Sequence, residues 1–179
     1  ASAARVGKMR REQNPGYTGQ EEFNYFLAVI FPDEQLHIMD YNRVVKDLNG
    51  MSDEQFMEKM KGLFHIKEYC GEGQYRPESK HTFGMYLNDK WYVLTAHGDI
   101  YDPNDPVDQL DVSILQKNVL DPLLGIKDPR TDSRIDFIGG IRGLGELERR
   151  VKEGMKVAFA MYPTSIEELI DIADAGKIM

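Results

Sequence analysis

The residues best suited to chemistry in this sequence are an arginine at the end of a predicted strand and a glycine-rich turn. Arg43 follows Asn42 in an otherwise apolar run, and a forked guanidinium can bind a carboxylate or phosphate bidentately. Gly139 and Gly140 connect a predicted strand to a helix, and Arg142 follows them. Free N–H groups at such a junction can bind phosphate, although neither dinucleotide-binding nor Walker spacing is present. Structural pairing of the arginine and close backbone packing of the glycines are the alternatives.

Two histidines and the single cysteine are the remaining candidates. A hairpin with Asn88–Lys90 as its loop would place Leu87 opposite Trp91, and therefore His81 opposite His97. Cys70 could lie on a neighbouring strand. Zinc requires three or four such ligands, and no close metal-binding spacing occurs. We therefore expect no metal, with His81, His97 and Cys70 as the residues to examine, or simply polar residues at a sheet rim.

The order of the predicted helices and strands indicates an α+β fold. In this fold, a mixed, largely antiparallel sheet is built from hairpins, and helices pack against it. Apolar β-rich runs predict one hairpin from 23–31 and 36–45, and a second from 81–87 and 91–97. Capping-box patterns predict helix starts at three places: Ser52 with Gln55, Ser113 with Gln116, and Thr164 with Glu167.

Composition and charge limit the class of protein. The 179 residues carry a formal net charge of -8, which disfavours direct nucleic-acid binding, and no run is long enough for a membrane span. A single cysteine fits a cytoplasmic location. We expect residues 1–20 to be a helix and linker left from an upstream domain, and 21–179 to be the α+β domain. Both ends are expected to be cut points in a longer polypeptide.

Five short sequence segments, which follow one another along the chain, resemble an uncharacterised bacterial family of unknown function. Members of that family are often labelled SpoOJ/ParA/ParB/RepB family proteins. The resemblance spans nearly the whole chain, which is similar to the C-terminal region of that family. The segments are Tyr41–Val45, Leu110–Gln116, Pro122–Ile126, Ile135–Gly140 and Tyr162–Thr164.

The resemblance implies more than this chain contains. The upstream half of such proteins is similar to the ParB/sulfiredoxin-like superfamily, which includes ParB-type CTPases and free-serine kinases. Residues 1–13 resemble the helix that follows the phosphate-handling turn of that superfamily, and Arg5 is the basic residue nearest to the turn. Lys177–Met179 resembles the start of a further family stretch. The implied cofactor is a nucleotide with Mg²⁺ in the longer protein, and the implied partner is the rest of the same polypeptide.

Three hypotheses about function follow. In the first, the chain is the C-terminal supporting region of a ParB-like, nucleotide-dependent bacterial protein that uses CTP, ATP or ADP as a CTPase or kinase does. In the second, it is a non-enzymatic interaction domain, for instance one that forms a homodimer. In the third, it is a small-molecule enzyme that uses Arg43 with His81 and His97, which an anion bound beside Arg43 would favour.

Overall fold

The computed structural model describes residues 2–177, in two compact units that divide between His37 and Ile38. The first unit contains α1 (Ser2–Gln13) and two short 3-10 turns, η1 (Glu22–Asn24) and η2 (Asp33–Gln35). The second unit contains the sheet and the remaining helices. Within residues 2–177, no helix is both long and apolar enough to cross a bilayer.

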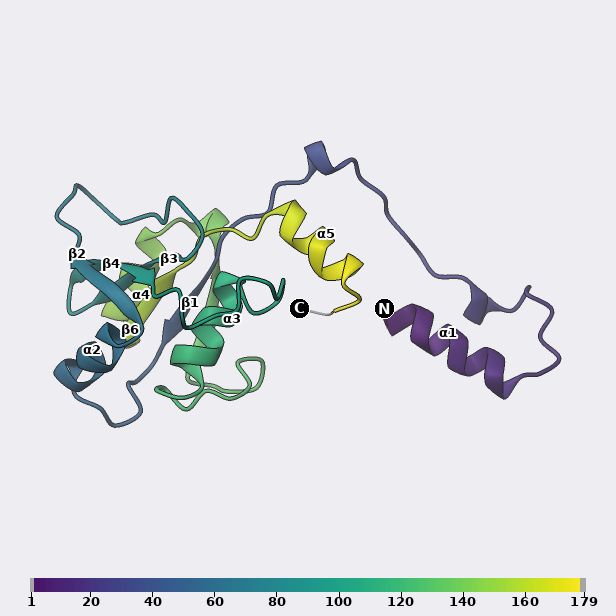
Figure 1. Ribbon diagram of the computed structural model, residues 1–179, viewed down its shortest axis with the longest axis horizontal. Helices are drawn as coiled ribbons and strands as arrows, with labels where there is room; N and C mark the ends of the chain where they lie inside the picture. The colour runs from purple at the N-terminus through teal and green to yellow at the C-terminus, as the bar shows by residue number, and fades with distance from the viewer. Residues whose placement is uncertain (1, 178–179) are drawn as a thin grey trace. The chain divides into compact units, whose positions relative to one another are not determined.

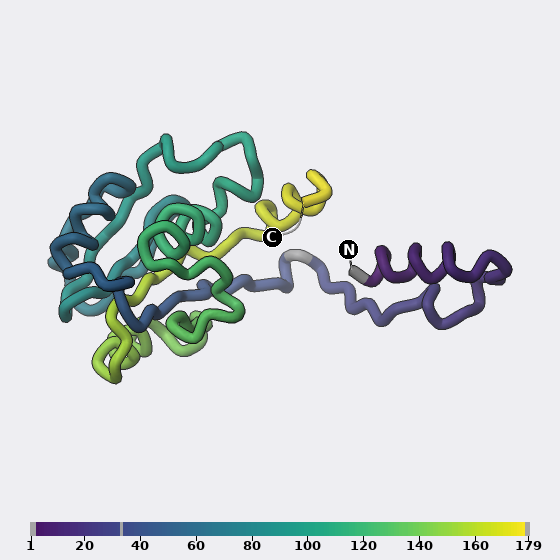
Figure 2. The backbone as a smooth tube through the Cα atoms, turned by 90° about the horizontal axis from the view of Figure 1, so that it is seen from below, coloured from purple at the N-terminus to yellow at the C-terminus, as the bar shows by residue number. Residues whose placement is uncertain are grey.

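The predicted strand over 23–31 is wrong. Residues 26–32 have an extended backbone that belongs to neither a helix nor a strand (Figure 2). Leu27 and Ile30 are 92% and 91% exposed. An apolar run becomes a buried strand only where other chain segments pair with its backbone and cover its side chains. The first hairpin therefore does not form, and of its second strand only Tyr41–Val45 is observed.

The second unit is built on one six-stranded sheet in the order β2-β4-β3-β6-β1-β5 (Figure 1). Each of its five ladders is antiparallel, and with the packed helices this confirms the α+β class. The strands are β1 (Tyr41–Val45), β2 (Phe64–Glu68), β3 (Thr82–Leu87), β4 (Lys90–Ala96), β5 (Ile135–Gly139) and β6 (Val157–Ala160).

Two helices of this unit begin at a capping box, in which side chains satisfy free N–H groups of the first turn. Ser52 forms the predicted capping box with Gln55, whereas the last helix is capped by Ser165 and Glu168, one residue later than predicted. Ser113 is not a cap, because its helix starts two residues earlier. The elements are α2 (Asp53–Lys61), α3 (Asp111–Leu115), η3 (Gln116–Leu120), η4 (Gly140–Arg142), α4 (Gly145–Lys152) and α5 (Ile166–Asp174).

The β3–β4 hairpin forms, but its register differs by one residue from the prediction. Its loop is the two residues Asn88 and Asp89, with φ of 52° and 58°, so that Leu87 pairs with Lys90. Positive φ at both central residues defines the tight turn whose twist matches that of paired strands. The backbone N–H of Ala96 donates to the carbonyl of His81, so that His81 does not face His97.

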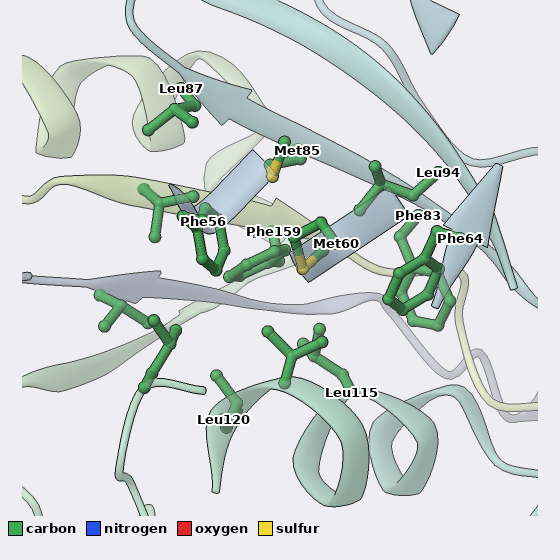
Figure 3. Close-up of a cluster of buried hydrophobic side chains, with 14 of the residues drawn as sticks. Phe56, Met60, Phe64, Phe83, Met85, Leu87, Leu94, Leu115, Leu120 and Phe159 are labelled. Carbon is green, nitrogen blue, oxygen red and sulfur yellow. The ribbon is translucent and has the colours of Figure 1, made fainter. Parts of the chain in front are cut away.

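The sheet has a hydrophobic cluster on each face, because successive strand residues alternate between faces. The larger cluster, partly drawn in Figure 3, includes Phe83 and Phe159 from the sheet, Phe56 and Met60 from α2, and Leu115 from α3. The smaller one packs α4 against residues such as Val44 and Ala158. On β1, Arg43 therefore lies on the α3 face and Asn42 on the α4 face.

Candidate functional site

A cavity of about 380 Å³ lies between the β1–β5 edge of the sheet and the helical segment that follows Leu110. Its volume falls in the lower part of the range for small-molecule sites. Arg43 and Phe137 contribute from adjacent strands, where they are directly opposite each other. The remaining lining residues are Val107, Val112, Ser113, Gln116, Lys117, Leu120 and Pro129. The cavity is thus mainly apolar, with a few polar groups.

Arg43 is the unusual group in this cavity. Its Nη1 atom is buried and has no hydrogen-bond partner. The guanidinium carbon lies 5.4 Å from the centroid of the Tyr41 ring and 5.2 Å from that of Phe137, distances at which a cation is attracted to an aromatic face. Burial lowers the pKa of Arg43 to about 10. The group remains charged at neutral pH, so the cavity contains a cation without a paired anion.

A π-helical turn supplies the opposite wall. In η3 the N–H of Asp121 donates to the carbonyl of Gln116, five residues earlier, at 3.0 Å. Such turns are rare and occur frequently at functional sites. Gln116 donates its own amide to the carbonyl of Ile126 at 2.8 Å, which leaves its side-chain oxygen as an acceptor. Lys117 is held by Asp108, with 2.7 Å between Nζ and Oδ1.

Asn42, the sequence neighbour of Arg43, has a structural role. Its side chain is fully buried, donates to Oδ2 of Asp40 at 2.6 Å and accepts the N–H of Met161 at 2.8 Å. Both ends of the amide are therefore occupied. Asn42 ties β1 to the end of β6 and does not face the Arg43 cavity.

The glycine-rich turn also packs against the protein itself. A Cβ atom added at Gly140 would collide with the carboxylate of Asp40. The backbone N–H of Gly140 donates to the Asp40 carbonyl at 2.8 Å. Gly139 pairs with Tyr41 as the last residue of β5, and Arg142 is an exposed side chain near Glu146. A 3-10 turn, η4, separates these glycines from α4. The close-packing interpretation therefore accounts for Gly140, while Arg5 is exposed on α1 in the first unit.

The three candidate metal ligands lie in different environments. His81 contacts the Tyr101 hydroxyl through Nδ1 at 2.9 Å and the Gln109 carbonyl through Nε2 at 3.1 Å. His97 packs edge-on against His65, and Cys70 is exposed. Among the described residues, no group of three or more His, Cys, Asp or Glu side chains could hold a metal ion.

A larger, open hollow of about 670 Å³ lies between α4 and the β3–β4 hairpin. Its polar groups are paired with one another: Lys90 with Glu68, Trp91 with Glu148, and Tyr86 with Asp89. Lys152 also lines this hollow, but it is exposed. Among the described residues, this hollow therefore has no buried side-chain atom without a hydrogen-bond partner, which is the feature that distinguishes Arg43.

A second buried atom without a partner is Oδ2 of Asp111, on the first turn of α3. The other carboxylate oxygen of Asp111 accepts the N–H of His81 at 2.8 Å. Burial, reinforced by the nearby Glu168 carboxylate, raises the pKa of Asp111 to about 7. Asp111 does not line the Arg43 cavity, although the next two residues do.

The sequence identified Arg43 but not its neighbours in the cavity. Ser113 and Gln116 have the spacing of a capping box and were interpreted in that way alone. Nothing in the sequence around Lys117 indicates that it lines a site. The available clue was the helical spacing of Val112, Gln116 and Leu120, which are four residues apart and therefore lie near one face of the helix.

Comparisons with known proteins identify the family. The model of the family described as "Protein of unknown function (DUF1015)" matches residues 1–113. No curated protein matches the chain. One solved structure, a mutant free serine kinase in complex with AMP, is similar at 14% identity with a TM-score of 0.45, over 79% of this chain and 49% of that one. The chain thus spans about half of that structure, a likeness too low to assign a function. From the family match we conclude that this chain belongs to the DUF1015 family of proteins of unknown function.

Proposed function

We propose that this domain binds a small anionic ligand in the Arg43 cavity. The single observation that carries the proposal is the buried Nη1 atom of Arg43 without a hydrogen-bond partner. A buried polar group without a partner is unfavourable by about 1–3 kcal/mol, and more if it is charged. A ligand oxygen that accepts a hydrogen bond from Nη1 would remove that penalty, so the penalty favours binding of an anion.

The wider setting is a nucleotide-dependent protein, as the sequence resemblance to ParB-like families implies. In this proposal CTP, ATP and ADP with Mg²⁺ are tested beside small carboxylates as anions for the Arg43 cavity, and nucleic acid is not a ligand of this domain. A cytoplasmic location is part of the same proposal and fits the exposed free thiol of Cys70.

The experiment is thermal unfolding of wild type, Arg43→Met and Arg10→Met with CTP, ATP, ADP, inorganic phosphate or acetate. A ligand at 100 times its Kd should stabilise the wild type by about 2.7 kcal/mol. Arg43→Met should lose this stabilisation, while its own unliganded stability should rise by about 1–2 kcal/mol, because an unpaired buried cation is gone. Arg10 is exposed on α1, so Arg10→Met is the matched control and should respond as wild type does.

Three results would count against this site. They are no stabilisation by any anion, equal stabilisation of wild type and Arg43→Met, and loss of binding in Arg43→Met through unfolding. The expected gain in the variant's stability separates a lost ligand contact from a damaged fold.

An interaction domain is the second candidate, favoured by the exposed apolar stretch from Tyr25 to Phe31. Phe26, Leu27 and Ile30 are 70%, 92% and 91% exposed, and an extended apolar segment without a pairing partner is a template for strand addition. We expect light scattering to show a concentration-dependent dimer that Leu27→Lys with Ile30→Lys converts to monomer. Ile141→Lys, at an isolated residue that is 82% exposed, is the control. A wild type that stays monomeric up to about 100 µM would reject this function.

A further inference from the structure

The charges around Arg43 restrict which anion the cavity can hold, if it binds an anion as proposed above. Within the cavity lining, Arg43 and Lys117 are the two cations. The ammonium of Lys117 lies 2.7 Å from the Asp108 carboxylate, and its side chain is 61% exposed. Of these two cations, only Arg43 has a buried nitrogen, Nη1, without a hydrogen-bond partner. The cavity therefore presents one net positive charge to a ligand.

The apolar walls make the ligand's charge decisive. Val107, Val112 and Leu120 line the cavity together with Pro129 and Phe137. In such surroundings an uncompensated charge is strongly unfavourable, whereas a single carboxylate would neutralise the single guanidinium. A phosphate monoester carries about two negative charges and a triphosphate carries more, so either would leave unbalanced negative charge beside apolar side chains.

The polar groups point to the same class of ligand. A guanidinium pairs with a planar carboxylate through two parallel hydrogen bonds. Ser113 and Gln116 are the neutral polar residues of the lining, and one of the two N–H groups of the Gln116 amide is already bonded to the carbonyl of Ile126. Fewer donors are therefore left for a ligand group with many anionic oxygens, such as a phosphate.

We infer that the Arg43 cavity selects a small monocarboxylate with an apolar body over a phosphate ester. The carboxylate would pair with the guanidinium of Arg43, and the apolar body would lie against Phe137 and Leu120. This inference names the ligand class of the proposed site and rests on that proposal.

The test measures the affinity of the 179-residue chain for four small molecules by calorimetry. Benzoate is the expected ligand, benzamide is its neutral counterpart, and phenyl phosphate and AMP carry the phosphoryl group. We expect benzoate to bind at least about tenfold more tightly than the other three, because only benzoate neutralises one buried cation. Arg43→Met should abolish benzoate binding, and Arg10→Met should leave it intact.

A second variant tests the charge count directly. Asp108→Asn releases Lys117 from its ion pair and adds a cation to the cavity, so the preference for benzoate over phenyl phosphate should shrink by about tenfold or reverse. An unchanged preference would overturn the inference.

The outcomes separate this inference from the broader proposal. If phenyl phosphate or AMP binds more tightly than benzoate, and the binding depends on Arg43, the anion site stands and the carboxylate inference is wrong. If none of the anions binds, both are wrong. If benzoate binds equally well to Arg43→Met, its site lies elsewhere and the inference fails.

Discussion

Replacing Asp111 with asparagine should raise the free energy of unfolding at pH 8 by about 2–3 kcal/mol. Asp111 is 9% exposed and carries the buried Oδ2 atom without a partner. Burial, together with the nearby Glu168 carboxylate, raises the pKa of Asp111 to about 7 from 3.8, while the hydrogen bond from the His81 N–H and the charge of Lys80 oppose this shift. At pH 8 the folded protein must therefore keep an ionised carboxylate where the neutral form is favoured.

The sign of the pH dependence follows from proton uptake. Between about pH 4 and pH 7 the folded state binds more protons at Asp111 than the unfolded state, so this group makes stability fall as pH rises. A pKa raised by about three corresponds to about 4 kcal/mol of lost stability when Asp111 is ionised. The Asp111→Asn variant would avoid this loss but recover only part of that free energy, because the N–H groups of its buried amide need an acceptor. The advantage of Asp111→Asn over wild type should therefore grow from pH 4 to pH 7 and stay constant above that.

Chemical denaturation across pH 4–8 measures this difference, and Asp108→Asn is the oppositely directed control. Lys117 lowers the pKa of Asp108, so the ionised form of Asp108 stabilises the fold, and Asp108→Asn should be less stable than wild type by a constant amount from about pH 4 to pH 8. If Asp111→Asn is less stable than wild type at every pH, or if its advantage does not change with pH, Asp111 does not titrate as described.

Local signals in the sequence predicted most of the second unit. Capping at Ser52 and the β-rich runs of the β3–β4 hairpin depend on neighbours within a few residues, and both elements form. The register was missed because the two-residue turn at Asn88 and Asp89 was interpreted as a three-residue loop. A one-residue slip changes the face of every side chain, and the predicted pairing of His81 with His97 was lost in this way.

Burial and site assembly were harder to predict because they depend on distant residues. The run from Tyr25 to Phe31 has the composition of a core strand but no partner strand among residues 2–177. Ser113 and Gln116 came to line a cavity because α3 starts at Asp111 and packs over β1 and β5, which no short-range pattern shows. Arg43 was found because a cation within an apolar run conflicts with local rules, and such conflicts are expected at functional sites.

Asn42→Leu should destabilise the fold by about 3–5 kcal/mol, the largest effect expected on β1. The Asn42 side chain is completely buried and makes hydrogen bonds of 2.6 Å to Asp40 and 2.8 Å to the Met161 N–H. Leucine fills a similar volume but leaves a carboxylate that is 6% exposed, and a backbone N–H, without these partners. Of the Asp40 side-chain contacts, a 3.4 Å ion pair with the largely exposed Arg76 would remain.

A double-mutant cycle with Asp40→Asn separates the lost hydrogen bonds from changes in packing. If the 2.6 Å bond matters as described, Asp40→Asn with Asn42→Leu should be less destabilised than the sum of the single variants by about 1–3 kcal/mol. Additive effects would mean that the Asp40–Asn42 contact contributes little. Because Asn42 and Arg43 point to opposite faces of β1, substitutions at these adjacent residues should separate the two roles. Changes at Asn42 should lower stability, whereas Arg43→Met should raise stability and remove ligand binding.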